Sequence, residues 1–180
     1  MKYQTNLKYF WGAAILIFLL DQGTKLWAIN FLPLEDEYII NQFLSFQRIF
    51  NEATFLLDTR LPIFSITEFR IIYVMIALTL TAGLYWVATK PALQATNIET
   101  EFAKTGLFFM MGSIWGNTFD RLFRSEGVID FIRINYFVEA IPILNIADIT
   151  LHIANLCFLI TWCIIIYKLI VTKFSLRYLK

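Results

Sequence analysis

Residues 71–89 read IIYVMIALTLTAGLYWVAT, an apolar run without a charged side chain. A helix needs about 20 mostly apolar residues to cross the hydrocarbon core of a bilayer, so this run predicts a membrane-spanning helix. Similar but less uniform runs predict further spans at about 9–31, 105–120 and 149–171. The chain of 180 residues is 58% hydrophobic and 16% charged, which excludes an ordinary soluble domain. We therefore expect an all-α integral membrane protein, with four transmembrane helices in a single membrane domain, residues 1–180.

The positive charges predict the orientation of the chain. An even number of spans places both termini on one side, together with the short segment 90–104. Segments 1–8, 90–104 and 168–180 hold eight Lys and Arg, whereas the longer opposite loops 32–70 and 121–148 hold six. The side that is richer in Lys and Arg is normally cytoplasmic, so both termini are predicted to be cytoplasmic. The two long loops are then extracytoplasmic.

The outer loops contain two stretches with the character of strands. Residues 37–51, EYIINQFLSFQRIFN, alternate apolar and polar side chains and are rich in aromatic and β-branched types. Residues 128–143, VIDFIRINYFVEAIPI, have a similar character, and Pro142 is expected to stop the strand before the last helix. These stretches predict a small extracytoplasmic β-sheet on the outer membrane surface.

Four acids lie at or inside the ends of the predicted spans: Asp21, Asp120, Asp130 and Asp148. An ionisable group in this position is costly and usually faces a polar pocket with a function. Simpler explanations exist for three of them. Asp21 and Lys25 are four residues apart and can pair on one helix face, and Asp120 can form an interfacial ion pair with its neighbour Arg121.

Asn145 followed three residues later by Asp148 is the pattern of a helix-capping box, which is compatible with a functional role for the same acid. Asn117 and Arg121 share a helix face at four-residue spacing, and Gly127 allows a sharp turn ahead of Asp130. Asn51 alone would be taken for a turn residue.

The remaining polar groups do not suggest a metal site. His152 is the only histidine, and the two cysteines, Cys157 and Cys163, lie in the last apolar run, where packing is their expected role. No phosphate-binding or dinucleotide-binding motif is present, and no basic cluster predicts nucleic-acid binding.

Taken together, the polar motifs resemble those of the bacterial lipoprotein signal peptidases (signal peptidase II), membrane aspartyl peptidases with four spans. The D-Q-x-T-K motif of that family is met by residues 21–25 and its G-N-x-x-D-R motif by residues 116–121. Its V-x-D-F motif is met by residues 128–131 and its N-x-A-D motif by residues 145–148. The four motifs occur in the order of the family and cover most of the chain.

The resemblance implies that Asp130 and Asp148 form a catalytic dyad that needs no cofactor. It implies cleavage of a diacylglyceryl-modified prolipoprotein just before the lipidated Cys, by a monomer of the bacterial inner membrane whose active site faces outward. The resemblance also implies binding or supporting roles for seven residues: Asp21, Lys25, Asn51, Asn117, Asp120, Arg121 and Asn145. Alternatives from other classes are a small proton-coupled membrane transporter and a non-catalytic homologue that binds lipoprotein precursors.

The sequence departs from the family pattern at three places. The family motif of the N-x-G-A-A-F type is represented here by residues 51–55, NEATF, which are one residue short and have no glycine. The stretch between Arg121 and Asp130 is one residue longer than usual, and Ala154 replaces a common glycine. These departures leave the acids in place and bear on the range of substrates and inhibitors.

Overall fold

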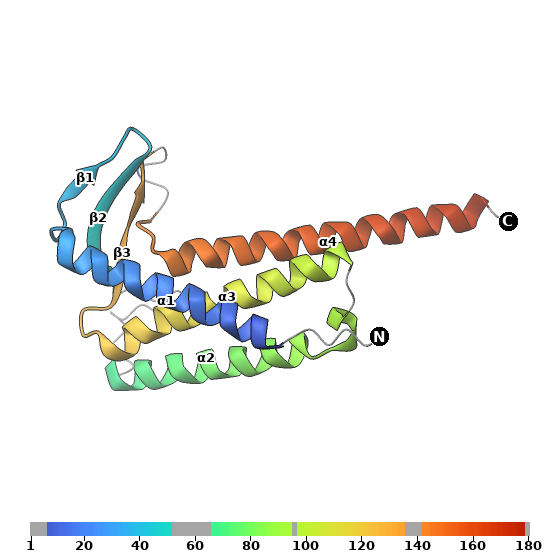
Figure 1. Cartoon of the computed structure of the whole chain (residues 1–180), viewed down its shortest axis with the longest axis horizontal. Coiled ribbons are helices and arrows are strands. Elements are labelled where there is room, and N and C mark those ends of the chain that lie inside the picture. Colours follow the sequence, from blue (N-terminus) through green and yellow to red (C-terminus); the bar gives the residue numbers. More distant parts are fainter. Residues whose placement is uncertain (1–6, 52–65, 95–96, 136–141, 179–180) are drawn as a thin grey trace.

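The computed structural model describes residues 7–51, 66–94, 97–135 and 142–178. Its four α-helices are α1 (Leu7–Phe31), α2 (Ile66–Ala88), α3 (Ile98–Phe123) and α4 (Ile146–Tyr178), with a short 3₁₀-helix, η1 (Pro91–Gln94), between α2 and α3 (Figure 1). Three of these helices are long and apolar enough to cross a membrane, over Trp11–Phe31, Thr67–Ala88 and Ile146–Phe174. The predicted class, a helical membrane protein with a small β-sheet, is confirmed; α3, which contains the predicted span 105–120, is not among these three helices.

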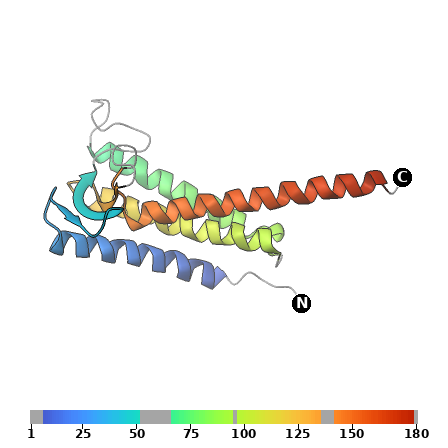
Figure 2. The ribbon, with the colours of Figure 1, turned by 90° about the horizontal axis from the view of Figure 1, so that it is seen from above.

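The helices extend beyond the apolar runs that predicted them. Helix α3 starts at Ile98 rather than near 105, because Asn97 caps it by accepting a hydrogen bond from the Thr100 N–H at 3.2 Å. Helix α4 starts at Ile146 and continues to Tyr178, beyond the end expected near 171. Both views of the fold show α4 extending past the other helices (Figures 1 and 2). Membrane thickness limits the apolar part of a helix, whereas caps and backbone hydrogen bonds decide where the helix ends.

Helix α3 lies at the centre of the bundle and contacts the three other long helices. Small residues allow the close approach. A Cβ added at Gly112 would lie 2.6 Å from the side chain of Ile17 on α1, and one added at Gly106 would lie 2.8 Å from the ring of Phe158 on α4. Packing through small residues is typical of membrane helices. The hydrophobic effect does not drive their association in lipid, so they depend on close van der Waals contact.

The sheet stands at the end of the bundle where α4 begins (Figure 1). Its strands β1 (Glu37–Ile39), β2 (Leu44–Asn51) and β3 (Val128–Ile134) are antiparallel in the order β1-β2-β3. The prediction of strands within 37–51 and at the start of 128–143 is confirmed; residues 136–141 lie outside the described part of the chain.

Apolar side chains join the sheet to the end of α1. Ala28 of α1 and Leu32, which directly follows this helix, form a buried cluster with Ile129 and Phe131 of β3. Trp27 packs edge-on against Phe131, with their ring centroids 6.1 Å apart. The cluster fixes β3, and therefore Asp130, relative to the helices.

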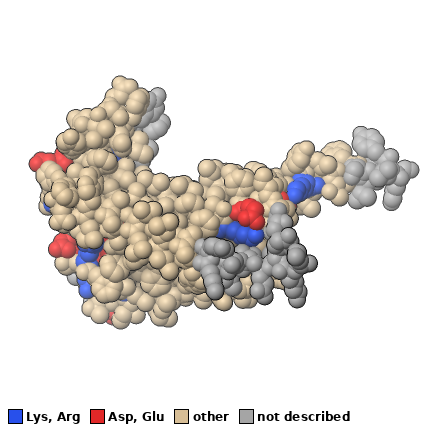
Figure 3. Space-filling model, viewed as in Figure 1, with Lys and Arg blue, Asp and Glu red and all other residues tan. Residues whose placement is uncertain are grey.

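Charge is distributed as expected for a chain that crosses a membrane. The face shown in Figure 3 has a broad band without Lys, Arg, Asp or Glu between charged atoms near the sheet and charged atoms toward the far end of α4. Buried acids and their partners lie at the sheet end. This end of the bundle therefore holds the candidate site.

Candidate active site

Asp130 lies in the middle of β3 with a side chain that is almost wholly buried, at 1% exposure. The amide Nδ2 of Asn51 donates to its Oδ2 at 2.8 Å, and that of Asn145 donates to its Oδ1 at 2.6 Å. Asn51 comes from the end of β2, where Ile49 lies opposite Asp130 in the antiparallel register. Sheet pairing therefore brings an asparagine from the first outer loop to an acid of the second.

Asp148 lies in the first turn of α4 and closes a capping box with Asn145. The Asp148 N–H donates to Asn145 Oδ1 at 2.9 Å, and the Asn145 N–H donates back to Asp148 Oδ2 at 3.1 Å. The capping prediction is confirmed. These reciprocal hydrogen bonds hold the Asp148 carboxyl group in place at the start of α4.

Asn145 connects the two acids. Its Oδ1 accepts from the backbone N–H of Asp148. Its Nδ2 donates to Asp130 Oδ1 at 2.6 Å and to Asn117 Oδ1 at 3.0 Å. Asn117 in turn donates to Asp148 Oδ1 at 2.9 Å. Asn145 itself is completely buried. The Asp130 carboxyl group is thus held by the side chain of Asn145, and the Asp148 carboxyl group by the Asn145 backbone N–H and by Asn117.

The environment of Asp130 favours its protonated form. Burial raises the pKa of the Asp130 carboxyl to about 7, and the nearby charge of Asp148 adds to the rise, while the hydrogen bonds from Asn51 and Asn145 partly oppose it. Two close carboxyl groups in a poorly solvated site share a proton rather than both ionising. At neutral pH the pair can therefore offer one acid and one base.

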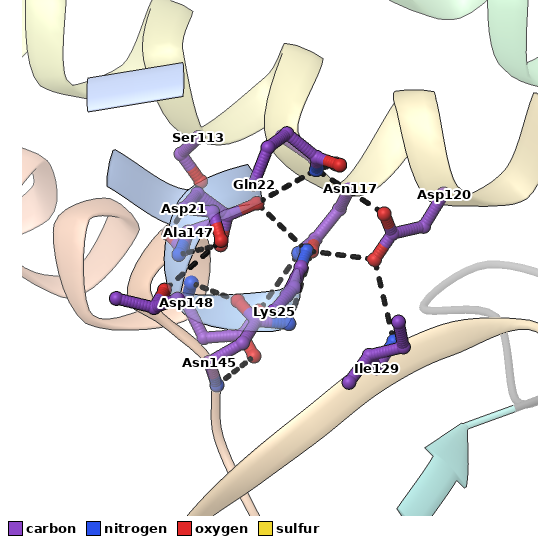
Figure 4. Close-up of polar contacts among 12 residues, drawn as sticks. Asp21, Gln22, Lys25, Ser113, Asn117, Asp120, Ile129, Asn145, Ala147 and Asp148 are labelled. Carbon is purple, nitrogen blue, oxygen red and sulfur yellow. Dashed lines mark hydrogen bonds and ion pairs between the residues drawn. The ribbon is translucent and has the colours of Figure 1, made fainter. Parts of the chain in front are cut away.

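A buried ionic cluster supports this pair from the helix side (Figure 4). Lys25 is fully buried; its Nζ lies 2.8 Å from Asp21 Oδ2, 2.9 Å from Asp120 Oδ2 and 2.9 Å from Asn117 Oδ1. The predicted pairing of Asp21 with Lys25 is confirmed. Arg124 brings a second cation, with Nε 2.9 Å from Asp120 Oδ1. Two acids and two cations make the cluster neutral.

The cluster holds the backbone next to each member of the pair. Asp21 Oδ1 accepts from the N–H of Ala147, at 2.8 Å, which directly precedes Asp148. Asp120 Oδ2 accepts from the N–H of Ile129, at 3.3 Å, which directly precedes Asp130. Asp21 and Asp120 are therefore placed to fix the positions of the other two acids.

The chain matches known proteins over most of its length. Residues 13–164 match the family described as Signal peptidase (SPase) II. The chain belongs to the signal peptidase II family. A lipoprotein signal peptidase of Clostridium novyi is 32% identical over 149 residues, which cover 79% of this chain and 90% of that protein. One from Clostridium tetani is 30% identical and covers 81% of this chain and 86% of its own.

Solved structures agree with this assignment. A bacterial membrane enzyme solved by the in meso method at 1.9 Å is 25% identical, with a TM-score of 0.70, and the match covers 90% of this chain and 97% of that one. This signal peptidase II is therefore an aspartic peptidase and a multi-pass bacterial membrane protein with lipoprotein signal peptidase activity.

One pairing expected from the sequence is wrong in this signal peptidase II. Asp120 does not pair with Arg121; its partners are Lys25 and Arg124. Successive residues on a helix do not face each other, so Asp120 points toward α1 while Arg121 turns toward α2. There the Arg121 guanidinium lies over the ring of Tyr73, 4.7 Å from its centroid, and donates to the Asn117 carbonyl at 3.2 Å.

Sequence reasoning missed three contributors to the site. Gln22 lies inside the motif of residues 21–25, and its side-chain amide Nε2 donates to Asp21 and Asp120 at 3.1 Å each. Arg124 could have been found from its four-residue spacing to Asp120. Ser113 donates to the Ala147 carbonyl at 2.7 Å and gave no signal of its own.

Replacing Gly116 with alanine should destabilise this enzyme. The added Cβ would lie 2.6 Å from Asp21 Oδ2 and 3.1 Å from the Ala147 Cβ, where neither neighbour has room to move. We expect a loss of about 1–3 kcal/mol, typical of overpacking, seen as a lower Tm in detergent together with reduced cleavage. Gly83→Ala on α2 is the matched control, because no atom lies within 4 Å of its added Cβ. Equal Tm values for the two variants would contradict this account of the packing.

Proposed function

We propose that this signal peptidase II removes the signal peptide of diacylglyceryl-modified prolipoproteins by cutting just before the lipidated Cys. The relatives from Clostridium novyi and Clostridium tetani are named lipoprotein signal peptidases, and both match most of this chain. A pair of acids at the membrane surface, with Asp130 buried and Asp148 half-buried, suits a scissile bond that lies next to a lipid anchor. The products are a free signal peptide and a lipoprotein with a new N-terminal Cys.

Asp130 and Asp148 are proposed as the catalytic dyad. The observation that carries this proposal is that Asn145 donates to both carboxyl groups, through its side-chain Nδ2 to Asp130 and through its backbone N–H to Asp148. The ionised Asp148 takes a proton from a water molecule, whose oxygen attacks the scissile carbonyl carbon. Asp130, whose pKa is raised to about 7, donates its proton to the carbonyl oxygen. Collapse of the tetrahedral intermediate then breaks the C–N bond: the amine leaves with a proton from Asp148, and a hydroxyl of the intermediate returns a proton to Asp130 as the carbonyl re-forms.

Seven further residues have proposed supporting roles. Asn51, Asn117 and Asn145 hold the carboxyl groups without adding charge, and Lys25 fixes Asn117 through its Oδ1 at 2.9 Å. Arg121 is held by Tyr73 at the edge of the site and is proposed to bind the substrate backbone. Asp21 and Asp120 are proposed to hold the backbone beside the dyad.

The proposal includes an arrangement in the membrane. We place both termini in the cytoplasm and the sheet on the outer surface of the inner membrane, because Lys and Arg are denser in the segments near the termini. Both acids and their supports come from one chain, so a monomer forming one membrane domain over residues 1–180 would suffice.

Cleavage of a defined substrate tests the proposal. The purified enzyme is given one prolipoprotein in two forms, with and without the diacylglyceryl group, and the products are identified by mass spectrometry. We expect only the modified form to yield a peptide that ends immediately before the Cys. Failure to cleave it, cleavage elsewhere, or equal cleavage of both forms would refute the proposed specificity.

Activity should fall as pH rises through about 7. Asp130 must hold its proton to act as the general acid, and its pKa of about 7 marks where this proton is lost. Above that pH, kcat/KM should decline about tenfold per unit, measured with the modified prolipoprotein. A rate that stays constant up to pH 9 would contradict the assignment of Asp130 as the acid.

The variant Asn51→Leu should raise the pH at which activity declines, which tests the same assignment of Asp130 as the acid. The Asn51 hydrogen bond lowers the pKa of Asp130, so its removal should move the decline of kcat/KM to higher pH. Asn30→Leu is the control, because among the residues that the structure describes Asn30 bonds only the Leu26 carbonyl of its own helix. We expect the control to keep the wild-type pH profile.

A further inference from the structure

Two polar side chains lie on the exposed surface of α4 inside its membrane-spanning part, which runs from Ile146 to Phe174. His152 and Asn155 are both exposed, and within the described part of the chain neither has a hydrogen bond or an ion pair. Other polar residues of this span are satisfied: Thr150 and Thr161 donate to helix carbonyls at 2.9 Å. Polar groups facing lipid without a partner are costly and usually mark a surface that meets something polar.

Helix geometry places these residues on the face of α4 that carries Asp148. They follow it by four and seven residues, one and two turns along the same side. The next residues of that face, Leu159 and Trp162, are apolar and exposed, at 59% and 64%. The face therefore begins with an acid, continues with two hydrogen-bonding groups and becomes apolar deeper in the membrane.

The opposite face of α4 packs against the bundle. Ala147, Ala154 and Cys157 are buried there, with Ala154 close to Gly106 of α3. The exposed face is thus not needed for packing of the described helices. The exposed face of α4 starts next to the sheet. The sheet projects beyond the bundle at the end where α4 begins, as the space-filling view shows (Figure 3).

A substrate that reaches the dyad from inside the membrane needs hydrogen-bonding partners of this kind. Hydrolysis requires an extended peptide at the two acids, and an unwound segment exposes N–H and C=O groups that lipid cannot satisfy. At a rise of 1.5 Å per residue, His152 lies about 6 Å and Asn155 about 10 Å below Asp148 along the helix. An extended peptide advances about 3.3 Å per residue, so these distances correspond to about two and three residues before the scissile bond.

We infer that His152 and Asn155 bind the backbone of the unwound signal-peptide segment immediately before the scissile bond, which determines which substrates are accepted. Imidazole and carboxamide groups each offer a donor and an acceptor, so either can satisfy a peptide N–H or C=O. Leu159 and Trp162 then contact the apolar helix of the same signal peptide. The inference rests on the proposed function, since it assigns a binding surface to its substrate.

The kinetic test replaces each group with an apolar one. His152→Leu and Asn155→Leu should each lower kcat/KM for the modified prolipoprotein about tenfold, and the double variant should lower it further, with Tm unchanged or higher. His152→Gln and Asn155→Gln should restore most of the activity because they keep a donor and an acceptor. Ile153→Leu is the control, as Ile153 is exposed but lies off this face. Wild-type kinetics in both leucine variants would overturn the inference.

A contact test separates this inference from the activity itself. A photoreactive amino acid at position 152 or 155, in the Asp148→Asn background, should link to substrate residues just before the Cys, whereas one at 153 should not. If positions 152 and 155 cross-link to the substrate but the wild-type enzyme does not cleave it, the binding surface is supported and the proposed reaction is rejected. Cleavage by wild type with links no stronger than at 153, or with links to a second enzyme copy, would reject the surface and keep the reaction.

Discussion

Replacing Asp148 or Asp130 with asparagine is expected to reduce kcat for prolipoprotein cleavage by at least about a thousandfold. A general acid or base contributes about 10²–10⁴ to the rate, and two groups that share one proton act as a unit, so each single loss should be near the top of that range. Asparagine at 148 can still accept from the Asn145 N–H, so the capping box persists. Folding should survive, with Tm close to that of wild type.

The control for this experiment is an acid outside the site. Asp36 is exposed in the outer loop before β1, and Asp36→Asn should cleave at the wild-type rate. Cleavage by Asp130→Asn or Asp148→Asn at more than a tenth of the wild-type rate would remove the dyad assignment. Loss of cleavage together with a large fall in Tm would point to a structural role for the acid instead.

Replacing Lys25 with methionine should be the most destabilising single change in the bundle. Its ammonium group is fully buried between Asp21 and Asp120, so its removal leaves an uncompensated negative charge in a site without water access. Loss of one partner from a buried ionic group costs about 3–5 kcal/mol. We expect a strongly lowered Tm in detergent and little cleavage, because Asn117 also loses a donor.

A second change should recover much of this loss. In Lys25→Met with Asp21→Asn the cluster is neutral again, since Arg124 still balances Asp120. Its Tm should lie well above that of Lys25→Met. Lys173→Met, at an exposed position of α4, is the matched control and should unfold like wild type. A double variant no more stable than the single one would show that charge balance is not what Lys25 provides.

The sequence predicted the architecture because apolar length and alternation follow directly from membrane thickness and strand geometry. The run 71–89 and the alternating stretch 37–51 each became the expected element. The capping box of Asn145 and Asp148 was also predictable, since it is local. Helix ends were less predictable because caps such as Asn97, rather than hydropathy, decide them.

Contacts between distant segments could not be predicted in the same way. Asn51 seemed a turn residue, and its bond to Asp130 depends on the β2–β3 register, which shifts between Phe46 and Ile49. Within α3, Asp120 pairs with Arg124 at four-residue spacing, but its pairing with Lys25 depends on which side of α3 faces α1. Such pairs are set by tertiary packing, which single-chain periodicity does not encode.

The capping box of Asn145 has a consequence for biosynthesis. Asn145 and Asp148 follow Asp130 and Asn51 in the chain, so they leave the ribosome later. Until the start of α4 has docked, the Asp130 carboxyl group lacks its hydrogen bond from Asn145. With Asp130 and Asp148 as the proposed dyad, we expect a nascent chain that lacks α4 to be inactive.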